Sequence, residues 1–109
     1  MIDWSRLREL REEIGADGLS DVVGVFLDET DEVMAGLPRM APAQLGAPLH
    51  FLKGSALNLG LRAFGALCEE GEQMATAGDA APVDLARLRT VYEASKTAFL
   101  AALARGAAA

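Results

Sequence analysis

The only histidine of the chain, His50, lies in the stretch LHFLKGSALNLG, with Lys53 and Gly54 three and four residues after it. On a helix, residues at these spacings lie on one face, so a cation and a residue without a side chain should flank the imidazole. A neutral imidazole is a nucleophile with two distinct nitrogens, and it accepts a phosphoryl group when positioning and a nearby cation assist the transfer. These residue types therefore indicate phosphoryl acceptance at His50, with Lys53 as the cation.

Gly54 falls in the middle of a predicted helix, where glycine costs about 1 kcal/mol of helix stability relative to alanine. At 3.6 residues per turn, the apolar residues form one stripe, and His50 projects about 140° from its centre, into solvent. The stripe consists of Leu45, Leu49, Leu52, Ala56 and Leu59. Gly54 shares the exposed face of His50, and Lys53 lies at its edge. Because in-line transfer leaves no room for a bulky residue, we interpret Gly54 as clearance for the active site of another protein.

Helical periodicity extends over almost the whole chain, and no stretch shows the alternation of a β-strand. Caps, glycines and prolines divide the chain into predicted helices, the first capped by Asp3 and ended by Gly15. The predicted ranges are 4–14, 18–37, a third helix from Pro42 or from near Pro48 to Gly60, 61–77 and 83–105, with a turn over 77–82 and a fraying alanine-rich end. Short connections between amphipathic helices favour antiparallel neighbours. We therefore expect an all-α fold, an antiparallel four-helix bundle with an additional short N-terminal helix across one end.

Composition narrows the classes of function. The 109 residues suit a single domain over 1–109, and the net charge of −6 argues against nucleic acid and anionic lipid as partners. No apolar run approaches the roughly 20 residues of a membrane span, and the charged start MIDWSRLRELREE differs from a signal peptide, so we expect a cytoplasmic protein. A single cysteine, Cys68, with a single histidine cannot assemble a zinc site.

The stretch HFLKGSALNLGLRAFGALCEEGE resembles the signature of histidine-containing phosphotransfer domains, in which a His-x-Leu-Lys-Gly-Ser helix is followed by a glycine turn and a second helix. The resemblance implies that His50 is phosphorylated, that Lys53 steadies the phosphoryl group and that Gly54 gives docking clearance. It also places Glu72 beside the histidine, where a carboxylate accepts a hydrogen bond from Nδ1–H and leaves Nε2 as the nucleophile. Gly71 stands where the family usually has leucine, which predicts looser packing under Glu72.

By this resemblance, the protein is an intermediate of a two-component phosphorelay that carries a phosphoryl group between aspartates of response-regulator receiver domains. The implied partners are receiver domains, a hybrid histidine kinase, or both. The chain has no phosphate-binding loop for ATP, so we expect a carrier and not an enzyme. It should need no cofactor, with Mg²⁺ on the partner receiver domain only, and should be a free-standing monomer. The alternative is an inactive helical adaptor that binds a receiver domain without phosphotransfer.

Several residues have a structural interpretation beside the functional one. Ser55 is assigned to partner docking, with a structural hydrogen bond to a neighbouring helix as the alternative. Glu72 is assigned to orientation of the histidine, with an ordinary surface charge as the alternative. Cys68 is expected in the core and not as a redox site. The first helix is expected to pack through Trp4, Leu7, Leu10, Arg11 and Ile14, and the second through a stripe that includes Phe26.

Overall fold

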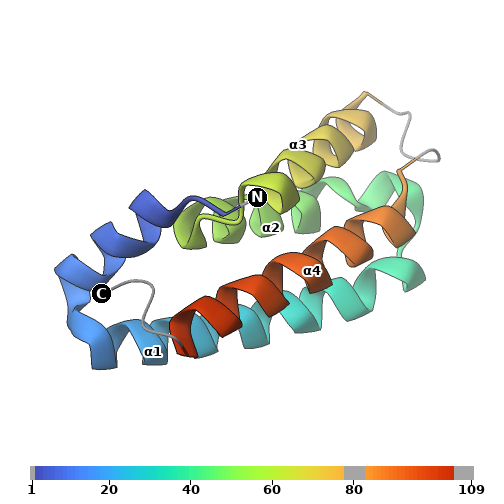
Figure 1. Cartoon of the computed structure of the whole chain (residues 1–109). Helices are drawn as coiled ribbons and strands as arrows, with labels where there is room; N and C mark the ends of the chain where they lie inside the picture. The colour runs from blue at the N-terminus through green and yellow to red at the C-terminus, as the bar shows by residue number, and fades with distance from the viewer. Residues whose placement is uncertain (1, 78–82, 105–109) are drawn as a thin grey trace.

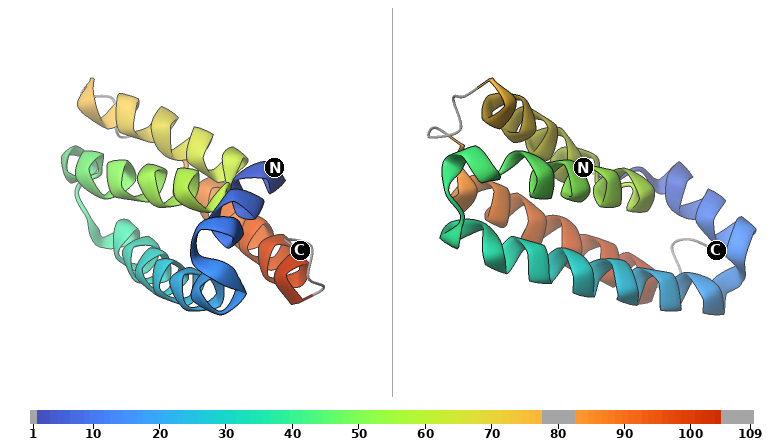
Figure 2. Two further views of the ribbon diagram at one scale, coloured as in Figure 1. Left: turned by 90° about the vertical axis from the view of Figure 1, so that its left-hand side faces the viewer. Right: turned by 180° about the vertical axis from the view of Figure 1, so that it is seen from behind.

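The computed structural model describes residues 2–77 and 83–104, which are almost entirely helical (Figure 1). The elements are α1 (Trp4–Gly36), the 3₁₀ turns η1 (Leu37–Arg39) and η2 (Pro42–Gln44), α2 (Gly46–Leu59), α3 (Arg62–Thr76) and α4 (Leu85–Ala104). Within these residues, β-pairing is limited to one isolated bridge between Ile2 and Leu61. Successive helices run in alternating directions, as Figure 2 shows from two further sides. The prediction of an all-α helical bundle is confirmed.

A kink divides α1 at Gly15, whose backbone is non-helical with φ 78° and ψ 166°. The predicted break is therefore present, although the two predicted helices run on as one element. Only Leu7 and Leu10 of the predicted inner stripe of the first segment are buried. Trp4 and Ile14, at the two ends of that segment, are exposed, so the prediction that they pack inside is wrong.

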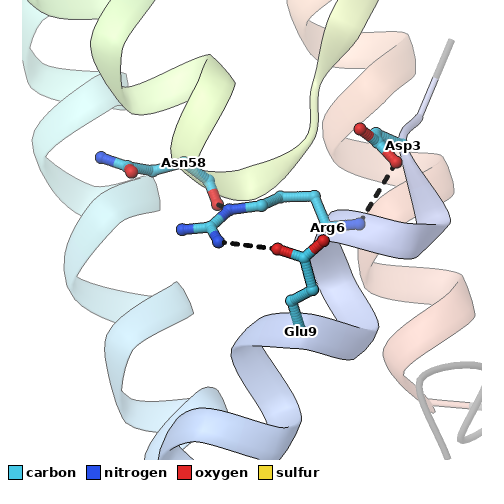
Figure 3. Close-up of polar contacts among 4 residues, drawn as sticks. All are labelled: Asp3, Arg6, Glu9 and Asn58. Atoms are coloured by element: carbon cyan, nitrogen blue, oxygen red, sulfur yellow. Dashed lines mark hydrogen bonds and ion pairs between the residues drawn. The ribbon is translucent and has the colours of Figure 1, made fainter.

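The start of α1 is attached to the turn between α2 and α3. Asp3 caps α1 by accepting a hydrogen bond from the backbone N–H of Arg6 at 3.2 Å, and Arg6 Nε donates to the carbonyl of Asn58 at 3.1 Å (Figure 3). The backbone N–H of Asp3 also donates to the carbonyl of Gly60 at 2.6 Å. Gly60 ends α2 with φ 80°, and a Cβ there would lie 2.7 Å from the carbonyl oxygen of Asp3. Only glycine suits both this backbone conformation and this close approach.

The sequence left open where the third predicted helix begins. The structure has two separate elements in this region. Pro42 begins the 3₁₀ turn η2, and α2 itself begins at Gly46. Pro48 is thus in the first turn of α2, where a backbone N–H has no intrahelical partner to lose. Pro48 therefore removes no hydrogen bond of α2 and need not kink the helix.

The core lies between the helices and includes the whole predicted stripe of the histidine-bearing helix. Leu49, Leu52, Ala56 and Leu59 of α2 are buried, and so is Leu45 just before it. The start of α2 and the facing part of α3 are thereby held in close contact, which fixes the place of His50 relative to α3.

A polar network ties α4 to α1. The hydroxyl of Tyr92 and the ammonium of Lys96 each donate to a different carboxylate oxygen of Asp31 at 2.6 Å. Burial alone would raise the pKa of Asp31, but the hydrogen bonds from Lys96 and Tyr92 outweigh it and hold the pKa below its usual value. The ring of Tyr92 also packs against Phe64 of α3 with the centroids 4.9 Å apart.

The last helix begins two residues later than the predicted start at Val83. Asp84 precedes it and accepts a hydrogen bond from the backbone N–H of Arg87 at 2.9 Å, which is the geometry of a helix cap. The predicted turn falls mainly on residues 78–82, and the predicted end of this helix and the fraying alanine-rich tail fall on 105–109. These residues lie outside the described part of the chain.

Candidate functional site

His50 lies on the outer face of α2, with 68% of its side chain exposed to solvent. This is the orientation that the helical periodicity predicts, because the residue lies well away from the apolar stripe that faces the core. The imidazole is therefore accessible to another protein without any rearrangement of the bundle.

One carboxylate of α3 contacts both functional side chains of α2. Oε2 of Glu72 lies 2.8 Å from Nδ1 of His50, and its Oε1 lies 2.9 Å from Nζ of Lys53. An ionised carboxylate only accepts hydrogen bonds, so the neutral imidazole must carry its hydrogen on Nδ1. Nε2 is then left with its lone pair.

The two charged members of this trio stabilise each other in their ionised forms. The pKa of Glu72 is lowered, mainly by the hydrogen bond from Lys53, while partial burial opposes the shift and His50 adds to it. The pKa of Lys53 is raised, mainly by the hydrogen bond to Glu72, against a smaller effect of burial. Lys53 therefore remains a cation and Glu72 an anion across the neutral range.

Gly54 provides open space one helical turn after His50. A Cβ at this position would have no heavy atom within 4 Å apart from its own neighbours in the helix. Packing inside the protein therefore gives no reason for the missing side chain. The surface above the glycine is free for an approaching molecule.

Comparison of the chain with models of protein families gives a match to the Hpt domain over residues 21–98, which is more than half of the chain. The chain belongs to the Hpt domain family. Neither the comparison with curated proteins nor that with solved structures finds a match. Membership implies a phosphotransfer role in a two-component phosphorelay, as a phosphocarrier module that interacts with receiver domains and kinases and does not itself use ATP. The matched range includes His50, Lys53, Gly54 and Glu72.

Ser55, which was assigned to partner docking, and Cys68, which was expected in the core, are both turned inward in this Hpt domain. Ser55 is only 5% exposed, which removes its side chain from the surface around His50. Cys68 is fully buried, and burial raises the pKa of its thiol to about 12, so the reactive thiolate is scarce at neutral pH. Its expected place in the core is confirmed.

Packing at Gly71 is close on the side that faces α2, so the predicted looser packing is not found there, although Gly71 also lines a shallow pocket with Leu67 and Leu88. A Cβ at Gly71 would lie 3.0 Å from Cδ1 of Leu49 and 3.5 Å from Cγ1 of Val83. On these two sides, the space that a side chain from α3 would need is therefore already occupied.

Sequence reasoning missed two apolar residues on the exposed face of α2. Phe51 directly follows His50 and is 40% exposed, and Leu57 lies one turn after Gly54 and is 60% exposed. Their spacing from His50 and Gly54 places them beside these residues and was readable from the sequence. The signal was overlooked because an apolar residue in an amphipathic helix is usually assigned to the core.

No metal site or membrane span accompanies this surface in the described residues. Across 2–77 and 83–104, no group of three or more His, Cys, Asp or Glu side chains is arranged to hold a metal ion. None of the helices described is both long and apolar enough to cross a membrane.

Proposed function

We propose that this Hpt domain carries a phosphoryl group on Nε2 of His50 between aspartates of receiver domains, including that of a hybrid histidine kinase. The observation that supports it best is the 2.8 Å contact between Nδ1 of His50 and Glu72 on an imidazole that is largely exposed. This contact fixes the tautomer and aims the lone pair of Nε2 away from α3. The expectations of a cytoplasmic monomer without a cofactor of its own, and of Mg²⁺ on the partner receiver only, form part of the proposal.

In the proposed step, the lone pair of Nε2 attacks the phosphorus of an aspartyl phosphate on the partner. The new P–N bond forms as the P–O bond to the aspartate breaks, and the aspartate carboxylate leaves with the electron pair of that bond. The proton on Nδ1 stays in place, so the phosphorylated ring becomes positively charged. The reverse step returns the phosphoryl group to an aspartate with the same atoms.

The charges around His50 suit this redistribution. The carboxylate of Glu72 contacts the nitrogen on which positive charge develops, and this interaction is stronger after transfer than before it. The ammonium of Lys53 supplies positive charge on the same face of α2. This charge attracts the negatively charged phosphoryl oxygens. Lys53→Ala should slow transfer without abolishing it, because the nucleophile and its orientation remain.

We assign docking of the receiver domain to the exposed face of α2. Gly54 leaves the approach to His50 open, while Phe51 and Leu57 offer apolar side chains on either side of it. Ser55 is no part of this surface because its side chain is buried.

Incubation with a phosphorylated receiver domain tests the proposal against the inactive adaptor. His50→Gln should abolish acid-labile phosphate on the protein and leave the helical circular dichroism unchanged, because the side chain contributes little to the core. An adaptor would bind the receiver equally well and gain no phosphate in either form. Uptake by His50→Gln at the rate of the unaltered protein would assign the phosphoryl group to another residue.

A further inference from the structure

Two successive residues of α2 face two successive residues of α3 at the site. At the surface, His50 meets Glu72, with Nδ1 and Oε2 2.8 Å apart. Directly beneath, the fully buried Leu49 meets Gly71, where a Cβ would lie only 3.0 Å from Cδ1 of the leucine. The buried pair and the polar pair are thus consecutive in both helices.

We propose that Gly71 is a positioning residue, whose missing side chain lets α3 approach α2 closely enough for Glu72 to reach Nδ1 of His50. The consequence for phosphotransfer rests on the function proposed above, but the geometric assignment does not. Gly71 touches none of the reacting atoms and acts only through Leu49 and Glu72.

Toward α2, the packing at Gly71 leaves a larger side chain little room, whereas on its other side Gly71 lines a shallow pocket with Leu67 and Leu88. Leu49 is at 0% exposure, and Val83 would lie 3.5 Å from the new Cβ on another side. Protein interiors are close-packed, so added atoms are accommodated by shifts of side chains and backbone. A shift of about 1 Å would stretch the His50–Glu72 distance beyond the roughly 3.2 Å limit of a good hydrogen bond.

The helix itself gains nothing from this glycine. A glycine inside a helix costs about 1 kcal/mol relative to alanine, and Gly71 has no positive φ that would require it. The close approach to Leu49 is thus the feature of the structure that accounts for glycine at this position.

The test follows the imidazole of His50 by long-range ¹H–¹⁵N NMR on the full chain, where the only histidine gives the only imidazole signals. At a pH where the ring is neutral, the unaltered protein should carry the hydrogen on Nδ1. Gly71→Leu should lose that signature and resemble Glu72→Ala, in which the acceptor is absent. The double variant Leu49→Ala with Gly71→Leu moves the bulky side chain from α2 to α3 and should recover it.

Gly65 offers a matched control on the same helix. It is also buried against α2, but a Cβ there would meet Ala56 at 3.4 Å, away from His50. Gly65→Ala should leave the Nδ1–H signature intact, while Gly71→Ala should weaken it. If Gly71→Leu fails to fold, the comparison of Gly65→Ala with Gly71→Ala and the result for the double variant test the assignment instead.

The assignment is overturned if a folded Gly71→Leu keeps the Nδ1–H signature, if the folded double variant lacks it, or if the unaltered protein never shows it. Transfer rates are measured on the same samples and should fall in Gly71→Leu as far as in Glu72→Ala. NMR results as expected without phosphoryl transfer in any sample would refute the proposed function and leave the positioning role of Gly71 standing.

Discussion

Nδ1 of His50 and Oε2 of Glu72 lie 2.8 Å apart across the gap between α2 and α3, and the other oxygen of the same carboxylate lies 2.9 Å from Nζ of Lys53. A single side chain of α3 therefore orients the imidazole and holds the neighbouring cation. Loss of Glu72 should disturb both effects together, whereas loss of Lys53 should disturb only one.

Substitutions of Glu72 separate its role as acceptor from its charge. Glu72→Gln keeps an oxygen that can accept the Nδ1 hydrogen but loses the ion pair with Lys53, whereas Glu72→Ala loses both. Removing a group that orients a histidine typically costs about 10-fold to 100-fold in activity at metal sites, and we expect a loss of this order for Glu72→Ala and a smaller one for Glu72→Gln. Single-turnover transfer from a phosphorylated receiver gives the rates. Equal rates in the unaltered protein and Glu72→Ala would reduce Glu72 to a surface charge.

The contacts of Glu72 should also depend on pH. Its pKa is lowered from the ordinary 4.5, so the stabilisation that it contributes is present above that value and is lost as the pH falls through the lowered pKa. A ¹³C NMR titration of the Glu72 carboxyl should give a midpoint below 4.5. In Lys53→Ala the midpoint should move up, because the hydrogen bond from Lys53 is the largest cause of the shift. A midpoint unchanged by that substitution would mean that the ion pair is not maintained in solution.

The periodicity of the sequence predicted which face of each helix is buried more reliably than which residues meet. The stripe of α2, the exposure of His50 and the break at Gly15 depend on residues close in sequence, and all three are present. The place of Glu72 beside His50 came from the resemblance to a family, since a pair 22 residues apart leaves no periodic signal.

Long-range pairs account for what the sequence did not reveal. Asp31 is 61 residues from Tyr92 and 65 from Lys96, and nothing local marks their contact. Gly71 was misjudged for the same reason, because the residue that fills its space, Leu49, lies on another helix. Trp4 was assigned to the core from the apolar periodicity of its segment. That periodicity does not show whether the neighbouring helices extend far enough to cover the end of the segment.

Ser95 provides a test of packing in α4 that is independent of the site. It is fully buried, and its Oγ has no hydrogen-bond partner in the described part of the chain. Leaving a buried hydroxyl unpaired costs about 1–3 kcal/mol, so Ser95→Ala should raise the free energy of unfolding by about 1 kcal/mol or more. Ser20→Ala, at an exposed position of α1, corrects for the higher helix propensity of alanine. Urea denaturation that gave both variants the same gain would show that the hydroxyl of Ser95 is satisfied.

Gly54 tests the docking surface separately from the nucleophile. Gly54→Gln places a long side chain in the open space beside His50 and should slow transfer from every receiver domain, while a small phosphodonor such as acetyl phosphate should still modify the histidine. Gly54→Ala should be tolerated, and it should stabilise the helix by up to about 1 kcal/mol.

Gly24 supplies the matched control for this docking test. It is an exposed glycine in α1, and a Cβ added there would have nothing within 4 Å, as at Gly54. Gly24→Gln should change helix stability by about as much as Gly54→Gln. It should leave receiver-dependent transfer unaltered, because Gly24 is in α1 and lies outside the docking surface assigned to α2. A loss confined to Gly54→Gln, and to protein donors, is the result that docking on α2 requires. If Gly54→Gln accepts phosphoryl from receivers as fast as Gly24→Gln, the approach of the partner does not pass over Gly54.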